Sequence, residues 1–203
     1  MSTGTQWATF DCYGTLIDWD SGLRAALGSE ELLRRYHEVE PDVQQEEPSR
    51  SYREVLIETA RRIGAPDPEG VAASLPEWES FPEVRLSLER AQAVGWGLAI
   101  LSNTDRDFIE ASMARIGVAF ELSIVASEIG SYKPDHGHWH AFARDVGRLP
   151  DVHVGASPFH DIAPATELGL KTIWVNRLGE RAESSPTREI HDLSPLPEVL
   201  DEL

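Results

Sequence analysis

Residues 9–18 hold the side chains whose types and order most clearly suggest chemistry. A short apolar run ends in Asp11 and is followed by a turn that contains Gly14 and the hydroxyl residue Thr15. Open parallel sheets bind ligands at the carboxyl ends of their strands, so Asp11 is a candidate nucleophile. Two residues further on stands Tyr13 rather than a second carboxylate. Without that general acid, the site suits a leaving group that departs without a proton.

Three further motifs carry side chains that can act on a substrate, and each follows an apolar run or precedes a turn. They contribute Ser102 and Asn103, then Lys133, then Asp161. Together with Asp-Cys-Tyr-Gly-Thr-Leu at residues 11–16, these motifs resemble the haloacid dehalogenase-like hydrolase superfamily and, within it, the L-2-haloacid dehalogenase (type II) branch. Four motifs in the right order are a specific signal, and the resemblance covers nearly the whole chain.

The resemblance implies a catalytic role for three charged residues. Asp11 would attack a carbon that bears a halide, and water would then cleave the aspartyl ester at its carboxyl carbon. Lys133 would balance the charge of Asp11, although a surface lysine before a turn proline is the alternative. Asp161 would orient or activate the water, or bind Mg²⁺ in phosphatase relatives; its structural alternative is a helix N-cap.

Four uncharged residues complete the predicted site. Thr15 is predicted to be catalytic through a hydrogen bond to the Asp11 carboxylate. The alternative, which is compatible with this role, is that its hydroxyl satisfies backbone groups of the turn. Ser102, also predicted to be catalytic, and Asn103 offer a hydroxyl and an amide to a substrate carboxylate or to the ester. Asn103 also fits a helix cap. Tyr13 is expected to contact the substrate.

Other positions depart from the dehalogenase pattern. Trp139 stands where those enzymes have a tyrosine near the substrate, and Ala156 and Pro158 stand where their fourth motif has Ser and Asn. Ser157 is the remaining hydroxyl there. We therefore expect Trp139 and Ser157 to line a pocket that is more apolar or differently shaped.

The dehalogenases also present a cap arginine to the halide. Arg34 and Arg35 are the predicted carriers here, and Arg53 is a third option. Each of them also fits an ordinary exposed helix position.

No metal or other cofactor is predicted. Tyr13 and Ala156 supply no carboxylate, which leaves too few oxygen ligands for Mg²⁺. A zinc site is conceivable at three closely spaced histidines, but no nearby third ligand of helical spacing or partner cysteine completes it. These are His136, His138 and His140. His160, beside Asp161, is either a proton acceptor in the pocket or a packing histidine.

Apolar runs bounded by turn signals alternate with helical patterns over much of the chain. The runs cover residues 7–10, 98–101, 122–126, 152–154 and 172–175. This alternation predicts an α/β fold, a three-layer Rossmann-like core around a parallel sheet. After the second run, Thr104 and Asp107 suggest a capping box for a helix that Gly117 ends. The tail is expected to add a last strand and a short helix.

About eighty residues separate the first two predicted strands, which is far more than a crossover needs. We expect a small helical cap at residues 18–82, inserted into a catalytic core formed by residues 1–17 and 83–203. A helix over residues 29–40 is predicted to be interrupted or ended by Pro41. A second covers residues 51–63 and stops at Gly64.

Bulk properties restrict the class of partner. The formal net charge of −17 argues against nucleic acid, and no apolar run is long enough to span a membrane. With no signal-like N-terminus and one cysteine, Cys12, expected to be buried, we predict a cytoplasmic protein. A small anionic substrate is the expected partner, so the pocket needs its own cations. The resemblance allows a homodimer.

The sequence therefore predicts a hydrolase that displaces halide from a small 2-halocarboxylate through an ester on Asp11. One alternative is a phosphatase of small phosphate esters with an unusual first motif. Another is a non-catalytic family member that binds a ligand or partner, an idea that the changes at Ala156, Pro158 and Trp139 motivate.

Overall fold

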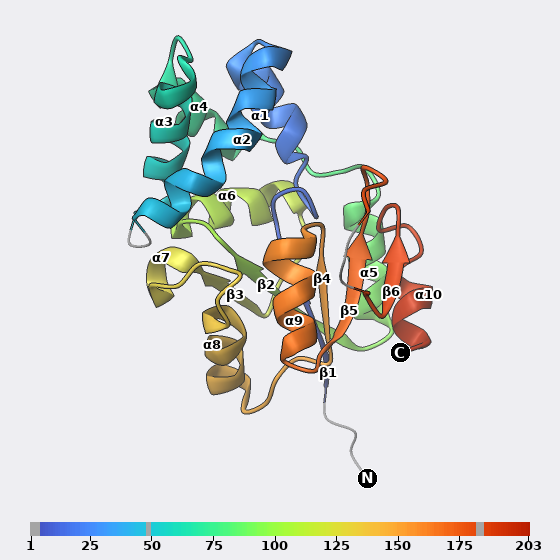
Figure 1. The fold of residues 1–203 in the computed structure, drawn as a ribbon. Helices are drawn as coiled ribbons and strands as arrows, with labels where there is room; N and C mark the ends of the chain where they lie inside the picture. The colour runs from blue at the N-terminus through green and yellow to red at the C-terminus, as the bar shows by residue number, and fades with distance from the viewer. Residues whose placement is uncertain (1–4, 48–49, 182–184) are drawn as a thin grey trace.

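A parallel six-stranded sheet forms the centre of the molecule (Figure 1). The computed structural model describes residues 5–47, 50–181 and 185–203. Its strands lie in the order β3-β2-β1-β4-β5-β6. Their bounds are β1 Gln6–Phe10, β2 Trp96–Ser102, β3 Leu122–Val125, β4 Val152–Gly155, β5 Lys171–Val175 and β6 Arg188–Ile190. The predicted α/β class is confirmed, as are the five predicted strands and the additional strand in the tail.

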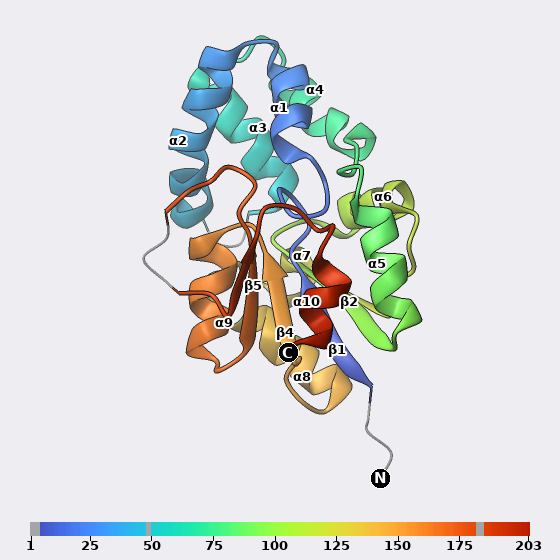
Figure 2. The same cartoon turned by 90° about the vertical axis from the view of Figure 1, so that its right-hand side faces the viewer.

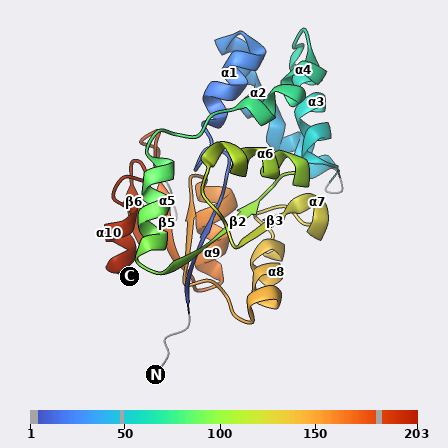
Figure 3. The same ribbon diagram turned by 180° about the vertical axis from the view of Figure 1, so that it is seen from behind.

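Helices cover both faces of the sheet (Figures 2 and 3). Along β2, Leu98 and Ile100 belong to one buried cluster and Ala99 and Leu101 to another, because successive side chains of a strand point to opposite faces. The first face carries α5 (Val84–Ala93), α6 (Arg106–Ile116) and α10 (Leu196–Asp201), and the second carries α8 (Gly137–Val146) and α9 (Ala163–Glu167). The short α7 (Ala126–Ile129) links β3 to α8.

A helical cap stands over the carboxyl ends of the strands (Figure 1). Its elements are α1 Trp19–Leu27, α2 Glu30–Glu46, α3 Tyr52–Ile63, α4 Pro68–Ser74 and the turn η1 Leu75–Glu77. Ser29 and Ser51 cap the starts of α2 and α3, and Gly64 ends α3 with a positive φ of 79°. The insertion therefore folds as a helical layer of its own.

The prediction that Pro41 interrupts or ends the helix over residues 29–40 is wrong. α2 continues through Pro41 to Glu46. A proline inside a helix removes one backbone hydrogen bond and crowds the preceding turn. Here Tyr36 and Val43, on either side of it, are both fully buried in the core cluster, and this packing keeps the helix continuous.

The predicted capping box of Thr104 and Asp107 is also wrong. Asp105 occupies the N-cap position of α6 but makes no capping bond there. Its carboxylate instead accepts from the backbone N–H groups of Tyr52 and Arg53, at 3.0 and 2.9 Å, and thus serves the first turn of α3. Asp105, a residue of the catalytic core, therefore satisfies backbone N–H groups at the start of α3 in the helical cap.

The chain passes between core and cap through two adjacent segments. Asp18 N–H donates to the Glu79 carbonyl and Phe81 N–H to the Leu16 carbonyl, at 2.9 and 3.0 Å. Ile17 and Ser80 form an isolated antiparallel bridge between these segments. The two connecting segments are therefore hydrogen-bonded to each other just beyond Asp11.

Cys12 is fully buried, as predicted. Among the helices of the described residues, none is both long and apolar enough to cross a membrane.

Candidate active site

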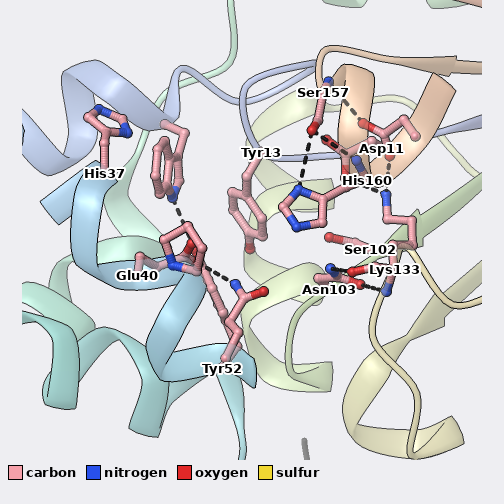
Figure 4. Close-up of a pocket in the computed structure, with 14 residues that line it drawn as sticks. Asp11, Tyr13, His37, Glu40, Tyr52, Ser102, Asn103, Lys133, Ser157 and His160 are labelled. Carbon is pink, nitrogen blue, oxygen red and sulfur yellow. Dashed lines mark hydrogen bonds and ion pairs between the residues drawn. The ribbon is translucent and has the colours of Figure 1, made fainter. Parts of the chain in front are cut away.

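A cavity of about 280 Å³ lies between the cap and the carboxyl ends of β1, β2 and β4 (Figure 4). Because all strands of the sheet run parallel, residues that follow different strands meet at this edge. We call it the cap–core cavity. It is lined by Asp11, Tyr13, Trp19, His37, Glu40, Pro41, Gln44, Tyr52, Ser102, Asn103, Lys133, Ser157, His160 and Asp161.

Lys133 joins two carboxylates at the base of the cavity. Its ammonium donates to Asp11 Oδ1 at 2.8 Å and to Asp161 Oδ1 at 2.6 Å. The side chains of Lys133 and Asp161 are each 1% exposed, whereas that of Asp11 is 13% exposed. Asp11 is therefore the carboxylate that a ligand can reach.

The pKa values of Asp11 and Asp161 are shifted in opposite directions, so the two carboxylates differ in basicity. Burial, opposed by the Lys133 ammonium and reinforced by the Asp161 carboxylate, raises the pKa of Asp11 to about 6. Burial also acts on Asp161, but Lys133 and His153 outweigh it and hold that pKa far below its usual range. Burial likewise opposes the charge of Lys133, yet its two carboxylate partners raise its pKa. At neutral pH, Asp11 is ionised but remains the more basic and more nucleophilic oxygen donor.

Thr15 holds the second oxygen of Asp11. The Thr15 hydroxyl donates to Asp11 Oδ2 at 3.0 Å and accepts from the Ala156 N–H at 2.9 Å. The turn that starts at Asp11 is thereby tied to the segment after β4. The anticipated bond to Asp11 is present, whereas the backbone group that the Thr15 hydroxyl satisfies belongs to Ala156 and not to its own turn.

Asn103 and Lys133 exchange two hydrogen bonds. Asn103 Nδ2 donates to the Lys133 carbonyl at 2.9 Å, and Lys133 N–H donates to Asn103 Oδ1 at 2.6 Å. Asn103 lines the cavity, but its amide is used mainly to fix the backbone of Lys133.

Ser102 offers an uncommitted hydroxyl next to this pair. Its Oγ is buried and has no hydrogen-bond partner among the described residues, and the side chain lines the cavity. His138 Nε2 lies 3.0 Å from the Ser102 carbonyl and supports the strand end from behind. A buried hydroxyl without a partner is costly unless a ligand satisfies it.

Ser157 and His160 form a polar pair on the opposite wall. Ser157 Oγ accepts from the His160 N–H at 3.0 Å and lies 3.2 Å from His160 Nδ1. Burial lowers the pKa of His160, so its imidazole is neutral at physiological pH. Figure 4 shows the ring projecting between Tyr13 and the Asp11–Lys133 pair.

Several predicted substrate contacts lie elsewhere. Trp139 is fully buried under the second face of the sheet, with its ring 5.0 Å from that of His153, because the apolar face of α8 packs on the sheet. Arg34 pairs with Glu31 and Glu38 on the exposed face of α2, and neither it nor Arg35 lines the cavity. Arg53 pairs with Asp107 and covers Phe108.

The sequence analysis missed the cap residues that do line the cavity. They are Trp19, His37, Glu40, Pro41, Gln44 and Tyr52. A signal for one of them exists in the sequence: Leu33, Tyr36, Glu40 and Val43 form the buried stripe of α2, and Glu40 is the charged member of it. Because burying a carboxyl group is costly, its presence on an otherwise apolar helix face indicates a role other than packing.

A larger cavity of about 650 Å³ adjoins the first and shares Tyr13, Trp19, His37 and Ser157 with it. Arg24 and Arg177 line this second cavity. Both guanidinium groups are paired, Arg24 with Glu30 and Arg177 with Glu83.

The residues around Asp11 do not fit a divalent cation well. Asp11 and Asp161 are the cavity's two core carboxylates, and both are already bonded to Lys133. Mg²⁺ requires near-octahedral oxygen coordination. Within the described ranges, no group of three or more His, Cys, Asp or Glu side chains is arranged to hold a metal ion, the three histidines of residues 136–140 included.

Comparison with known proteins gives relatives of two kinds. Phosphoserine phosphatase of Thermus thermophilus is 29% identical over 155 residues, covering 71% of this chain and 61% of that protein. (S)-2-haloacid dehalogenase 1 of a Pseudomonas species is 29% identical over 126 residues, covering 61% and 56%. The chain therefore aligns with only about three-fifths of the length of these curated relatives.

Solved structures match over almost the full chain. The L-2-haloacid dehalogenase of Xanthobacter autotrophicus with chloropropionic acid covalently bound has a TM-score of 0.86 at 19% identity, with 98% and 99% of the two chains covered. The 2-haloacid dehalogenase of Pseudomonas syringae pv. Tomato has a TM-score of 0.66 at 29% identity, with the same coverage. Residues 5–169 match the family model described as haloacid dehalogenase-like hydrolase. The chain therefore belongs to the haloacid dehalogenase-like hydrolases.

Proposed function

We propose that this hydrolase displaces halide from a small 2-halocarboxylate through a covalent ester on Asp11. The observation that carries the proposal is the group at position 13. Tyr13 Oη lies 3.0 Å from Ser112 Oγ, and burial raises the pKa of Tyr13 far above its usual range. A phenol that holds its proton so tightly is a poor general acid, so the site favours a leaving group that is stable as an anion.

The first step is a displacement at carbon. An Asp11 oxygen forms a bond to C2 of the substrate, and the electrons of the carbon–halogen bond leave with the halide. Lys133 and Thr15 hold the attacking carboxylate in one orientation. Its partial exposure lets the substrate reach it, and its pKa of about 6 keeps it ionised at neutral pH.

The second step is hydrolysis of the ester. Water attacks the carboxyl carbon of Asp11, the bond between that carbon and the ester oxygen breaks, and this oxygen leaves on C2 as the hydroxyl of a 2-hydroxy acid. Asp161 is already engaged by Lys133 and by the Ser157 N–H, and its low pKa makes it a weak base. We assign the proton of the water to His160, which then returns it to the departing oxygen. Nε2 has no hydrogen-bond partner among the described residues and can accept this proton when Nδ1–H donates to Ser157 Oγ.

The core side of the cavity supplies donors for the substrate carboxylate. Ser102 Oγ is buried and unpartnered among the described residues, and it lies beside Asn103 and Lys133 on the same wall. Similarity to dehalogenases supports this substrate class. (S)-2-haloacid dehalogenase 1 is 29% identical, and the Xanthobacter enzyme was solved with chloropropionic acid covalently bound.

A screen of halide release from short 2-chloro, 2-bromo and 2-fluoro acids tests the proposal. We expect release from at least one acid, unchanged by a chelator and absent in Asp11→Asn. Failure of all acids to release halide would contradict it.

Phosphate-ester hydrolysis is the second candidate, because in sequence the Thermus phosphoserine phosphatase aligns over 71% of the chain and (S)-2-haloacid dehalogenase 1 over 61%. Against it stand Tyr13 at the general-acid position and the poor fit for Mg²⁺. Release of phosphate from an aryl phosphate that requires Mg²⁺ would favour this candidate.

A further inference from the structure

The cap side of the cavity has the composition of a cation site. Figure 4 shows Glu40 on α2, separated from Asp11 and Lys133 by the ring of Tyr13. Glu40 is 8% exposed and lines the cavity. A buried carboxylate is stable only when a hydrogen bond or a charge compensates its lost hydration.

Protein groups compensate Glu40 only in part. Its Oε1 accepts from Gln44 Nε2, a neutral amide one turn away. His37, one turn earlier, is 3.1 Å from Asp20 and so already has an anionic partner. Burial, weakly opposed by Gln44 and His37, raises the pKa of Glu40 to about 7. No arginine or lysine of the described residues forms an ion pair with it.

Aromatic side chains complete this end of the cavity. The rings of Tyr13 and Tyr52 stack with their centroids 6.0 Å apart. Trp19 Nε1–H is already used on Tyr52 Oη, at 3.0 Å, so the indole offers carbon surface rather than a donor. Aromatic faces around a carboxylate attract organic cations through the ring quadrupole.

The charges around the cavity point the same way. Lys133 is neutralised by two carboxylates, the pKa of His160 is lowered, and the predicted arginines Arg34 and Arg35 do not line the cavity. The cap end therefore provides a carboxyl group where the sequence analysis expected a cation. A cation bound at this end would favour the ionised form of Glu40, whereas an anion would disfavour it.

We propose that Glu40, with Tyr13, Trp19 and Tyr52, forms a subsite for an organic ammonium group of the substrate. The inference rests on the proposed function for the reacting end and extends it. The preferred substrate is a zwitterion, with its carboxylate beside Ser102, its halogen-bearing carbon at Asp11 and its ammonium at Glu40.

Binding can be tested without turnover. Asp11→Asn is titrated calorimetrically with an alkylammonium such as butylammonium and with butanol, which has a neutral polar end. We expect the ammonium to bind about tenfold or more tightly, since a hydrogen bond to a charged group contributes at least about 1.5 kcal/mol. Adding Glu40→Gln should remove the preference, whereas Glu38→Gln, an exposed change on the same helix, should preserve it.

Turnover gives the second readout. 2-Chloro acids with an ammonium on the third, fourth or fifth carbon are compared with alkyl analogues of equal length. One ammonium acid should show at least tenfold higher kcat/KM, through KM, and Glu40→Gln should abolish that advantage. Equal binding of butylammonium and butanol, or a preference that survives Glu40→Gln, would overturn the subsite. If the subsite binds but no acid releases halide, the proposed function fails and the subsite stands.

Discussion

Lys133 and Asp11 lie 122 positions apart in the chain, yet the Lys133 ammonium donates to Asp11 Oδ1 at 2.8 Å. The same ammonium binds Asp161 more closely, at 2.6 Å. One cation thus serves two carboxylates of unequal basicity. Asp161 therefore stays ionised, while Asp11 is the more basic carboxylate and the one that reacts.

Replacing Lys133 by Met should lower activity to a measurable residual level and destabilise the fold. Loss of one partner from a buried ion pair costs about 3–5 kcal/mol, and without the ammonium the pKa of Asp11 should rise further. We expect a lower Tm and an acid limb of the rate profile displaced to higher pH. Lys171, the other lysine, is exposed on β5, and Lys171→Met is the control. A Lys133→Met protein with an unchanged pH profile would contradict the assignment.

The rate should depend on pH through Asp11. Its pKa is raised to about 6, so the nucleophile is ionised above that pH and protonated below it. We expect kcat/KM to fall toward tenfold per pH unit below about 6. A rate that stays constant down to about pH 4, the ordinary range of an aspartate, would show that the carboxylate is not perturbed in this way.

Thr15→Val should weaken catalysis with little change in side-chain size. The substitution deletes the bond to Asp11 Oδ2 and leaves the Ala156 N–H without its acceptor. A hydrogen bond to a charged group contributes about 1.5–3 kcal/mol, which corresponds to roughly 10- to 150-fold in rate. Thr15→Ser keeps the hydroxyl and should retain most of the activity; equal losses in the two variants would argue against the hydrogen bond.

His160→Gln should separate the two chemical steps. Halide displacement does not need the imidazole, but ester hydrolysis should slow by about 10²–10⁴. Intact-protein mass spectrometry should then detect accumulated ester after a burst of halide. His140→Gln, on the exposed side of α8, is the matched control. If the His160 variant turns over at the normal rate without a burst, another group activates the water.

Periodicity and motif order predicted the parts of the structure that depend on local sequence. The alternation of apolar runs with helical patterns along the chain placed Asp11 and Ser102 at one edge of a parallel sheet, a position that topology fixes. The course of α2 through Pro41 could not be predicted locally, because packing of Tyr36 and Val43 decides it. Asp105 shows the same limit, since its partners are the Tyr52 and Arg53 backbone of another subdomain.

The orientation of the cap helix was the least predictable part of the site. Adjacent residues on a helix point about 100° apart, so the choice between Arg34 or Arg35 and Glu40 depends on how α2 docks. The docked face presents Glu40, and the arginines remain outside. Trp139 was placed by analogy with one family position, and the packing of α8 on the sheet takes it out of the cavity.

Isotope labelling of Asp11 tests the central claim most directly. Wild-type protein in excess over a 2-halo acid that it turns over is allowed one turnover in ¹⁸O-water, then digested and examined by mass spectrometry. Attack of water on the Asp11 ester predicts ¹⁸O in the peptide that contains Asp11 and unlabelled oxygen in the first-turnover hydroxy acid. Label in the product alone, with none in that peptide, would contradict the covalent mechanism.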